Sequence, residues 1–304
     1  HGIKVAILDL AFDTSNTKIS DNISESKSFR YDFDGALVPV QGFGHENIHG
    51  TGVAEIITDI APDTEVYLYT IATELEFENA VDYAISKNVD LIAMSAGWVN
   101  YPTDGTSSMT KKVEHAITQD IPFVISAGNY AETHWEGKYS DTNSNNWHEF
   151  SGSDESLSVS VNDDRVSSGQ PIVLYLMWDK PGQVHDFDLT LYDPAGEIAD
   201  HSSSTQNTAA DELYEYIFFT PDVSGDYSIG ISYNGNAAPN STLEVFSPTD
   251  MLEYTTSSGS VGVPTDANGA MVVGAVHYFD LELESFSSQG SNKQWQKSTK
   301  RCSP

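Results

Sequence analysis

The feature that most constrains the fold is the alternation of two textures over the first 130 residues. Short apolar runs without period-two alternation are typical of strands buried on both faces of a parallel sheet. These runs span 3–8, 65–71, 90–95 and 122–127. Amphipathic helical patterns separate them, at 50–61, 75–88 and 107–120. Strands and helices in this rhythm predict an α/β fold with a doubly wound parallel sheet.

A different pattern follows residue 130. Six segments alternate apolar and polar residues, and turn signals such as Asn234-Gly235 lie between them. The segments span 156–162, 171–178, 186–193, 213–219, 226–233 and 242–246. They predict an antiparallel β-sandwich. The run 270–276 then indicates another doubly buried strand, so an all-β sandwich is expected to interrupt the α/β domain.

Four segments follow from these patterns. Residues 1–150 are predicted to form the first part of the α/β domain, 151–250 the inserted β-sandwich, and 251–290 the resumed α/β domain. Residues 291–304 hold four of the fourteen basic residues, the only Cys and no acidic residue. This contrast with the acidic body predicts an aberrant basic tail.

The charge balance excludes several classes of partner. The chain of 304 residues has 45 acidic and 14 basic residues, a formal net charge of −31. Nucleic acids and anionic membranes need clustered Lys and Arg, so neither is expected as a partner. The sequence has no apolar run long enough to span a bilayer. A single Cys excludes a disulfide framework, and we expect a monomer.

Three polar residues stand at positions where chemistry is expected. Asp9 ends the first apolar run, and the carboxyl ends of parallel strands line the functional crevice of such sheets. His49 precedes Gly50 and Gly52, which leave room for close approach of a ligand or backbone. Asn129 follows the run 122–127. Taken singly, each has a structural alternative as a loop cap, a solvated histidine or a turn residue.

Together and in this order, the three residues and their surroundings resemble the subtilisin-like serine endopeptidases, the subtilases. KVAILDLAFD resembles the family's catalytic Asp segment, HGTGVAE resembles its His helix, and FVISAGN resembles its oxyanion segment. LIAMSAG is similar to the family's substrate-binding strand, and GAMVVGAV followed by ESFSSQG to the run that leads towards the nucleophile. Five ordered matches are more specific than any single motif.

The resemblance implies a secreted serine endopeptidase that hydrolyses peptide bonds with an Asp-His-Ser triad. Asp9 would orient His49, His49 would take the serine proton, and Asn129 would donate to the oxyanion. The chemistry would need no cofactor, and a signal and pro-segment are expected outside this sequence. An extended polypeptide substrate would pair with two backbone edges, Ser95, Ala96 and Gly97, and Ser126, Ala127 and Gly128.

The sequence departs from the family at its C-terminal end. No Gly-Thr-Ser motif with a small-residue helix appears after residue 290, so we expect a fragment that ends before the nucleophile and is inactive as written. The triplet at 105–107 precedes the oxyanion segment, and Lys111 and Lys112 follow it, which indicates coincidence. Without the missing helix, apolar faces of the runs 3–8 and 90–95 are expected to be exposed and folding to be poor.

The predicted sandwich resembles small modules attached to secreted peptidases. Asp141, Asn143 and Asn145 echo positions 1, 3 and 5 of a calcium loop, although Asn146 replaces the usual Gly at position 6 and no Glu stands at position 12. A structural calcium ion and a plain polar turn are both open. The remaining histidines show no metal-ligand spacing, and those at 134 and 148 are expected to be structural.

Another class of function is open as well. A non-catalytic binding protein could use the subtilase scaffold to present the acidic sandwich. The two functions differ in whether the gene encodes a serine of the Gly-Thr-Ser type after residue 290. An α/β hydrolase of other chemistry is disfavoured, because the sequence has no G-x-S-x-G elbow.

Overall fold

A computed structural model describes residues 2–42, 47–179, 184–208, 213–236 and 238–290. Two compact units are present. The first comprises the residues up to Gly128 together with Gly262–Ala275, and the second comprises Asn129–Val261 together with residues 276–290. The predicted basic tail, 291–304, lies outside the described residues. In the described ranges, none of the helices is long and apolar enough to cross a membrane.

A six-stranded parallel sheet organises the first unit, in the order β14-β5-β4-β1-β3-β2. Every strand pair in it is parallel, which confirms the predicted α/β class. The strands are β1 (Lys4–Asp9), β2 (Ile23–Ser28), β3 (Glu65–Thr70), β4 (Leu91–Met94), β5 (Phe123–Ser126) and β14 (Met271–Val273).

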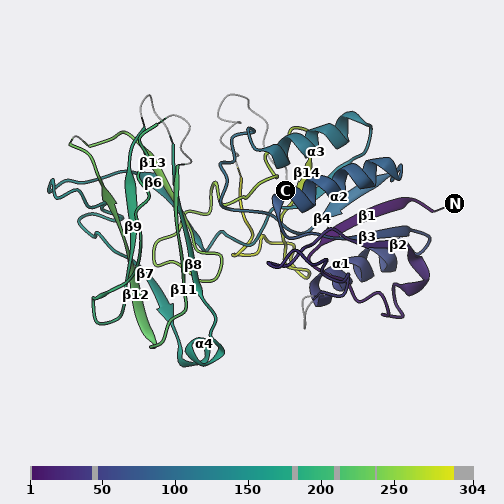
Figure 1. The fold of residues 1–304 in the computed structure, drawn as a ribbon, viewed down its shortest axis with the longest axis horizontal. Coiled ribbons are helices and arrows are strands. Elements are labelled where there is room, and N and C mark those ends of the chain that lie inside the picture. Colours follow the sequence, from purple (N-terminus) through teal and green to yellow (C-terminus); the bar gives the residue numbers. More distant parts are fainter. Residues whose placement is uncertain (1, 43–46, 180–183, 209–212, 237, 291–304) are drawn as a thin grey trace. The chain divides into compact units, whose positions relative to one another are not determined.

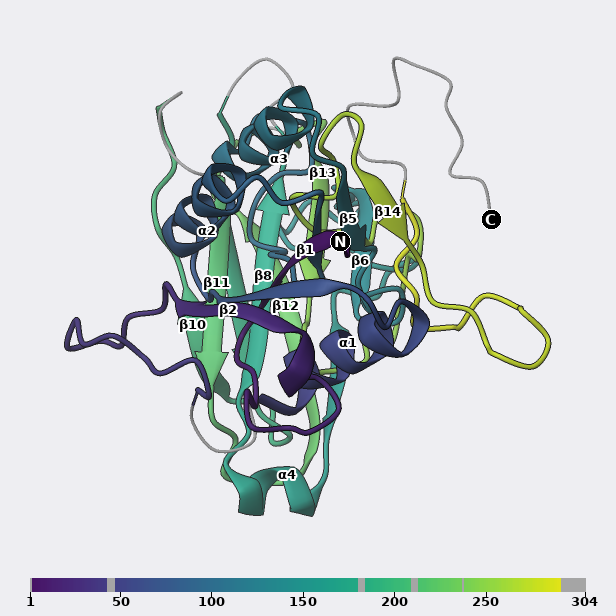
Figure 2. The same ribbon diagram turned by 90° about the vertical axis from the view of Figure 1, so that its right-hand side faces the viewer.

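Helices cover both faces of this sheet. They are η1 (Ser20–Asn22, a 3-10 turn), α1 (Asn47–Ile60), α2 (Glu74–Ser86) and α3 (Ser108–Thr118). α2 and α3 lie on one face and α1 on the other (Figures 1 and 2). Alternate residues of β1 separate accordingly: Ala6 and Leu8 join the core with α2 and α3, whereas Val5 and Ile7 pack with α1. Asp9 continues the second series and therefore faces α1.

The exposed apolar surface of this unit differs from the expectation. Strands β1 and β4 are buried, with Ile7 and Ile92 fully inaccessible, because α1 covers one face and α2 and α3 the other. β14 is an edge strand and is not doubly buried as predicted. Large exposed apolar side chains occur instead on α1 and β14, among other places, and include Ile48, Ile56, Ile60, Met271 and Val273.

The second unit is built from two four-stranded antiparallel sheets, ordered β10-β9-β12-β7 and β11-β8-β13-β6 (Figure 1). Both sheets contribute to one hydrophobic core, to which Leu189 and Leu176 belong. The elements are β6 (His134–Lys138), β7 (Leu157–Val161), α4 (Asp163–Ser168), β8 (Ile172–Trp178), β9 (Phe187–Tyr192), β10 (Ile198–Ser202), β11 (Tyr214–Phe219), β12 (Gly225–Tyr233) and β13 (Thr242–Phe246).

The unit boundaries differ from those expected at 150 and 251. β6 pairs with β13, so the second unit begins at Asn129. Residues 276–290 also join it, since the Ala131 N–H donates to the Phe286 carbonyl at 3.2 Å. The sequence of β6, HWEGK, has no readable alternation of apolar and polar residues, and it was therefore not recognised as a strand.

Asp266 ties the loop before α3 to the rest of the first unit. It is fully buried and accepts hydrogen bonds from the Gly105 N–H at 2.7 Å and the Thr110 hydroxyl at 2.6 Å. Ser107 caps α3, its hydroxyl oxygen accepting the Thr110 N–H at 3.0 Å. The Gly-Thr-Ser triplet is thus part of a helix cap.

We expect Asp266→Ala to destabilise the chain by about 1–3 kcal/mol, because it leaves the buried Gly105 N–H without its acceptor. The matched control is Asp104→Ala. Asp104 is exposed, and among the described residues its carboxylate accepts from the nearby Thr106, so its loss should cost less than about 1 kcal/mol. Urea unfolding of both variants measures the difference, and equal costs would contradict the role of Asp266.

Candidate active site

Two residues predicted from the sequence come together at the carboxyl end of β1. The Nδ1 atom of His49 lies 3.0 and 2.8 Å from the two carboxylate oxygens of Asp9. Asp9 is 1% exposed, whereas the His49 side chain is 57% exposed. A buried carboxylate thus holds an imidazole whose far side is open.

Gly50 permits this contact. A Cβ atom at position 50 would lie 2.4 Å from the Ala11 carbonyl oxygen and 3.0 Å from both the Asp9 Cβ and a ring carbon of Phe12. The first turn of α1 therefore approaches the end of β1 as closely as only glycine allows. Gly52 has open space around it, so the close approach expected at both glycines occurs at Gly50 alone.

Thr51 also ties this helix turn to the loop that follows β1. Its hydroxyl accepts the Asp13 N–H at 2.8 Å and donates to the Asn47 carbonyl at 2.5 Å. The loop that leaves β1 is thereby attached to the start of α1. This bond and the close approach at Gly50 set the distance between the helix and the strand.

Hydrogen bonding defines the tautomer of His49. An ionised carboxylate only accepts, so Nδ1 of the ring carries the proton and donates to Asp9. The Leu10 N–H also donates to Asp9, at 2.8 Å. Nε2 is then left with a lone pair that can take a proton. Burial raises the pKa of Asp9, while His49 and the Leu10 N–H act in the opposite direction.

The raised pKa of Asp9 predicts a pH dependence of stability. The folded state holds the Asp9 proton more tightly than the unfolded state, so the contribution of Asp9 to the free energy of unfolding decreases as the pH rises above about 3.9. The decrease ends above the folded-state pKa. Asp9→Asn should remove this slope in urea unfolding measured across acidic pH. An unchanged slope would contradict the assignment.

The expected substrate-binding backbone follows β4 and β5. Both strands end at the same edge of the sheet as β1, because all three are parallel. Ser95 and Ala96 are half-buried and Gly97 is exposed. The Ala127 N–H donates to the Val273 carbonyl at 2.8 Å. This N–H is therefore already paired with β14 and is not free to bind a substrate backbone.

The remaining residues near β5 lie where the chain turns out of the sheet. Ser126 is the last residue of β5, and Gly128 has a φ of +101°, which favours glycine. Asn129 comes next, is exposed and is the first residue of the second unit. The structure thus brings Asp9 and His49 together within the first unit. Asn129 follows β5, the strand after which the sequence analysis placed it.

The predicted calcium loop lies in the second unit and is closed by a residue that the sequence analysis missed. Asp141 accepts the N–H groups of Asn145 and Asn146 at 3.1 and 2.9 Å. Asn146 has a φ of +68°, the conformation for which glycine is usual at position 6. One Glu155 oxygen accepts from the side-chain amides of Asn143 and Asn145 at 2.7 and 2.8 Å. Glu155 stands at position 15 of the loop, outside the expected spacing.

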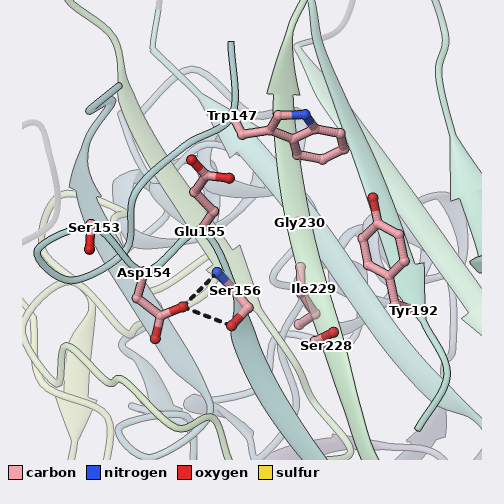
Figure 3. Close-up of a pocket in the computed structure, with 9 residues that line it drawn as sticks. All are labelled: Trp147, Ser153, Asp154, Glu155, Ser156, Tyr192, Ser228, Ile229 and Gly230. Atoms are coloured by element: carbon pink, nitrogen blue, oxygen red, sulfur yellow. Dashed lines mark hydrogen bonds between the residues drawn. The ribbon is translucent and has the colours of Figure 1, made fainter. Parts of the chain in front are cut away.

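A hollow of about 450 Å³ lies next to this loop. Figure 3 shows the rings of Trp147 and Tyr192 beside Gly230, with the carboxylates of Asp154 and Glu155 across from them. Asp154 accepts the N–H and hydroxyl of Ser156 at 3.0 and 2.8 Å. Glu155 therefore belongs both to the loop and to the wall of the hollow.

We expect added Ca²⁺ to raise the melting temperature through this loop. Asp141, Asn143, Asn145 and Glu155 supply the oxygen ligands that Ca²⁺ prefers. A concentration one hundred times Kd should stabilise the fold by about 2.7 kcal/mol. Asp141→Ala and Glu155→Gln should lose most of the shift, whereas the exposed Asp222→Ala should keep it. The same shift in all four proteins would exclude this loop.

Comparisons with known proteins bear on the family and on the fold. The model of the subtilase family matches residues 1–259. The Major intracellular serine protease of Bacillus subtilis (strain 168) is 29% identical over 143 residues, which cover 42% of this chain and 43% of that protein. The structure of the Clostridium perfringens CspB protease has a TM-score of 0.57 at 16% identity, covering 96% of this chain and 73% of that one.

The structural comparison bears on the fold, and the family model bears on the family. The likeness to the Clostridium protein supports the fold, and the relative from Bacillus matches over less than half of its own length. The family model spans most of the chain, including both residues of the Asp9–His49 pair. The sequence-based family assignment is confirmed: the chain belongs to the subtilase family.

Proposed function

We propose that this chain supplies the general base and its orienting acid in a serine endopeptidase that acts on polypeptides. The observation that carries the proposal is the 2.8 Å contact between buried Asp9 and Nδ1 of half-exposed His49. A non-catalytic scaffold has no need of a buried carboxylate aimed at an exposed imidazole, because burying a charge is costly. The pair therefore favours catalysis over the binding-protein alternative.

The two residues divide the proton transfers between them. Asp9 holds the proton on Nδ1, so Nε2 of His49 can take the proton of a serine hydroxyl as that hydroxyl attacks the peptide carbonyl. The buried carboxylate then stabilises the imidazolium, and Nε2 returns the proton to the leaving amine. Within the described ranges no serine is hydrogen-bonded to His49, and we propose that the nucleophile lies outside them.

Asn129 and the strand edges complete the proposed site. The side-chain amide of Asn129 would donate to the oxyanion that forms during attack. An extended substrate would add a strand to the backbone at Ser95–Gly97 and at residues 126–128, with Ala127 contributing its carbonyl because its N–H is taken. This chemistry needs no cofactor; calcium would act only on stability.

The cellular location and the oligomeric state are separate proposals. We infer a monomer that is secreted, as the resemblance to secreted peptidases first suggested. The Bacillus subtilis relative is named an intracellular protease, so family membership alone does not decide the compartment. Fractionation of the organism that encodes the protein would decide between a secreted and an intracellular location.

Labelling with a fluorophosphonate probe tests the proposed function. Two samples are compared: the protein purified from the organism that encodes it, and the 304-residue polypeptide. We expect labelling of the first and loss of that labelling in His49→Ala. We expect no labelling of the polypeptide, because none of its described serines is hydrogen-bonded to His49.

The outcomes separate the two parts of the proposal. Labelling of the polypeptide that depends on His49 would support the peptidase chemistry and show that the nucleophile is within these 304 residues. Labelling that persists in His49→Ala would contradict the serine mechanism. So would the absence of labelling in protein purified from the organism, provided that its circular dichroism shows a native fold.

A further inference from the structure

Three side chains of the kinds that bind metals converge within the second unit. His134 and Glu136 are two residues apart on β6 and so lie on the same face of that strand. Glu244 on β13 is the cross-strand partner of Glu136, and Phe246 is the partner of His134. One ligand atom from each of the histidine and the two glutamates lies within 4.8 Å of the others.

The cluster is buried and rich in negative charge. His134 is 0% and Glu244 2% exposed, and Glu136 is half-buried. Removing a carboxylate from water is costly, and buried carboxylates in proteins therefore pair with an opposite charge or coordinate a metal ion.

The hydrogen bonds of His134 define which ring nitrogen is free. Nδ1 lies 2.6 Å from the Thr256 carbonyl oxygen, which only accepts, so Nδ1 carries a proton. Nε2 lies 3.2 Å from a carboxylate oxygen of Glu244, which is also an acceptor when ionised. In the neutral imidazole, two lone pairs therefore face each other. Metal-binding histidines have this same arrangement, with the far N–H donated to a backbone carbonyl.

We propose that Nε2 of His134 and the carboxylates of Glu136 and Glu244 bind one divalent transition-metal ion, with Zn²⁺ as the preferred ion. Imidazole nitrogen together with carboxylate oxygen suits zinc, whereas Ca²⁺ selects oxygen alone. Bonds of about 2.0–2.1 Å in a tetrahedron place neighbouring ligand atoms about 3.4 Å apart. The 3.2 Å between His134 and Glu244 is close to this value.

Neighbouring residues pack against the three ligands. The Phe246 ring packs on the His134 ring, with centroids 4.5 Å apart, and the Thr256 N–H donates to the His134 carbonyl at 2.8 Å. Gly259 lies above the cluster with a φ of +82°, and a Cβ there would be 3.4 Å from a Glu136 carboxylate oxygen. The bound ion would hold β6, β13 and the segment that contains Thr256 and Gly259 together.

Zinc titration of the complete 304-residue chain tests the site. The chain is stripped with a chelator and titrated in excess Ca²⁺, so that the 141–155 loop does not contribute. We expect one equivalent of Zn²⁺ by calorimetry, and Co²⁺ in its place should give the visible absorption of a four-coordinate ion. Glu136→Gln should weaken binding by at least about tenfold, a loss seen even for outer-shell partners.

The control variant is Glu132→Gln, the same change at another half-buried glutamate of this unit, which should bind Zn²⁺ like the wild type. Glu136 is the decisive position because its partial exposure lets the variant fold, and circular dichroism checks that it does. The absence of one-to-one Zn²⁺ binding, or equal binding by the Glu136→Gln variant and the wild type, would overturn the site.

Discussion

Replacement of Asp9 by asparagine is expected to lower kcat by about 10⁴ in the protein that carries the nucleophile, the loss found when the acid of an Asp-His-Ser triad becomes an amide. The reason lies in the two donors that meet at Asp9. The Leu10 N–H requires an acceptor, and the amide oxygen of the variant would take that bond. The amide NH₂ would then face Nδ1 of His49. His49 would place its proton on Nε2 and could no longer accept one from serine.

Asp13→Asn is the matched control for this experiment. Asp13 lies on the same loop after β1, and its carboxylate accepts from Ser15 and not from His49. The control should keep kcat within a factor of about two, as expected of a change away from the reacting groups. Peptide hydrolysis measured at saturating substrate gives both values. Equal losses in the two variants would show that Asp9 acts through the loop and does not orient the histidine.

The sequence predicted β1, β3, β4 and β5 well because these strands are short and mostly buried, whereas the partly exposed β2 was not predicted. Such runs are recognised by their apolar content alone, and the helices between them have clear periodicity. β14 was misjudged for the same reason, since Met271 and Val273 are apolar but belong to an exposed edge strand. An apolar run does not reveal whether a neighbouring element covers it.

The proposed metal ligands that the sequence analysis missed are brought together by tertiary structure and not by sequence spacing. Glu155 reaches the 141–145 loop because the chain folds back on itself. Glu244 and His134 are 110 residues apart in sequence and meet because their strands pair. Local motif templates do not include such partners. Asp9 and His49 were recognisable because each stands at an element boundary within its own short motif.

Gly50 and Gly52 show how alike two positions can look in sequence while the structure treats them differently. Both are helical glycines on the first turns of α1. In an exposed helix, alanine is more favourable than glycine by about 0.8–1.0 kcal/mol. Gly52→Ala should therefore keep or raise stability, because nothing lies within 4 Å of the added Cβ.

Gly50→Ala is expected to have the opposite sign. Its Cβ would meet the Ala11 carbonyl oxygen at 2.4 Å, and a backbone atom held between β1 and α1 cannot rotate away. The helix has to move outward, at a cost of about 1–3 kcal/mol for overpacking. That movement also carries Nδ1 of His49 away from Asp9, and a displacement of about 1 Å at a catalytic group can cost about 10² in rate.

The paired experiment measures urea unfolding of both alanine variants and, in the protein that carries the nucleophile, the rate of fluorophosphonate labelling. Gly52→Ala should match or exceed the wild-type stability and label at the wild-type rate. Gly50→Ala should lose both, with the rate falling more than the folded fraction does, because the Asp9–His49 distance fails before the sheet unfolds. A Gly50→Ala variant that labels normally would mean that the pair tolerates a shifted helix, and the close approach of α1 to β1 would then serve packing alone.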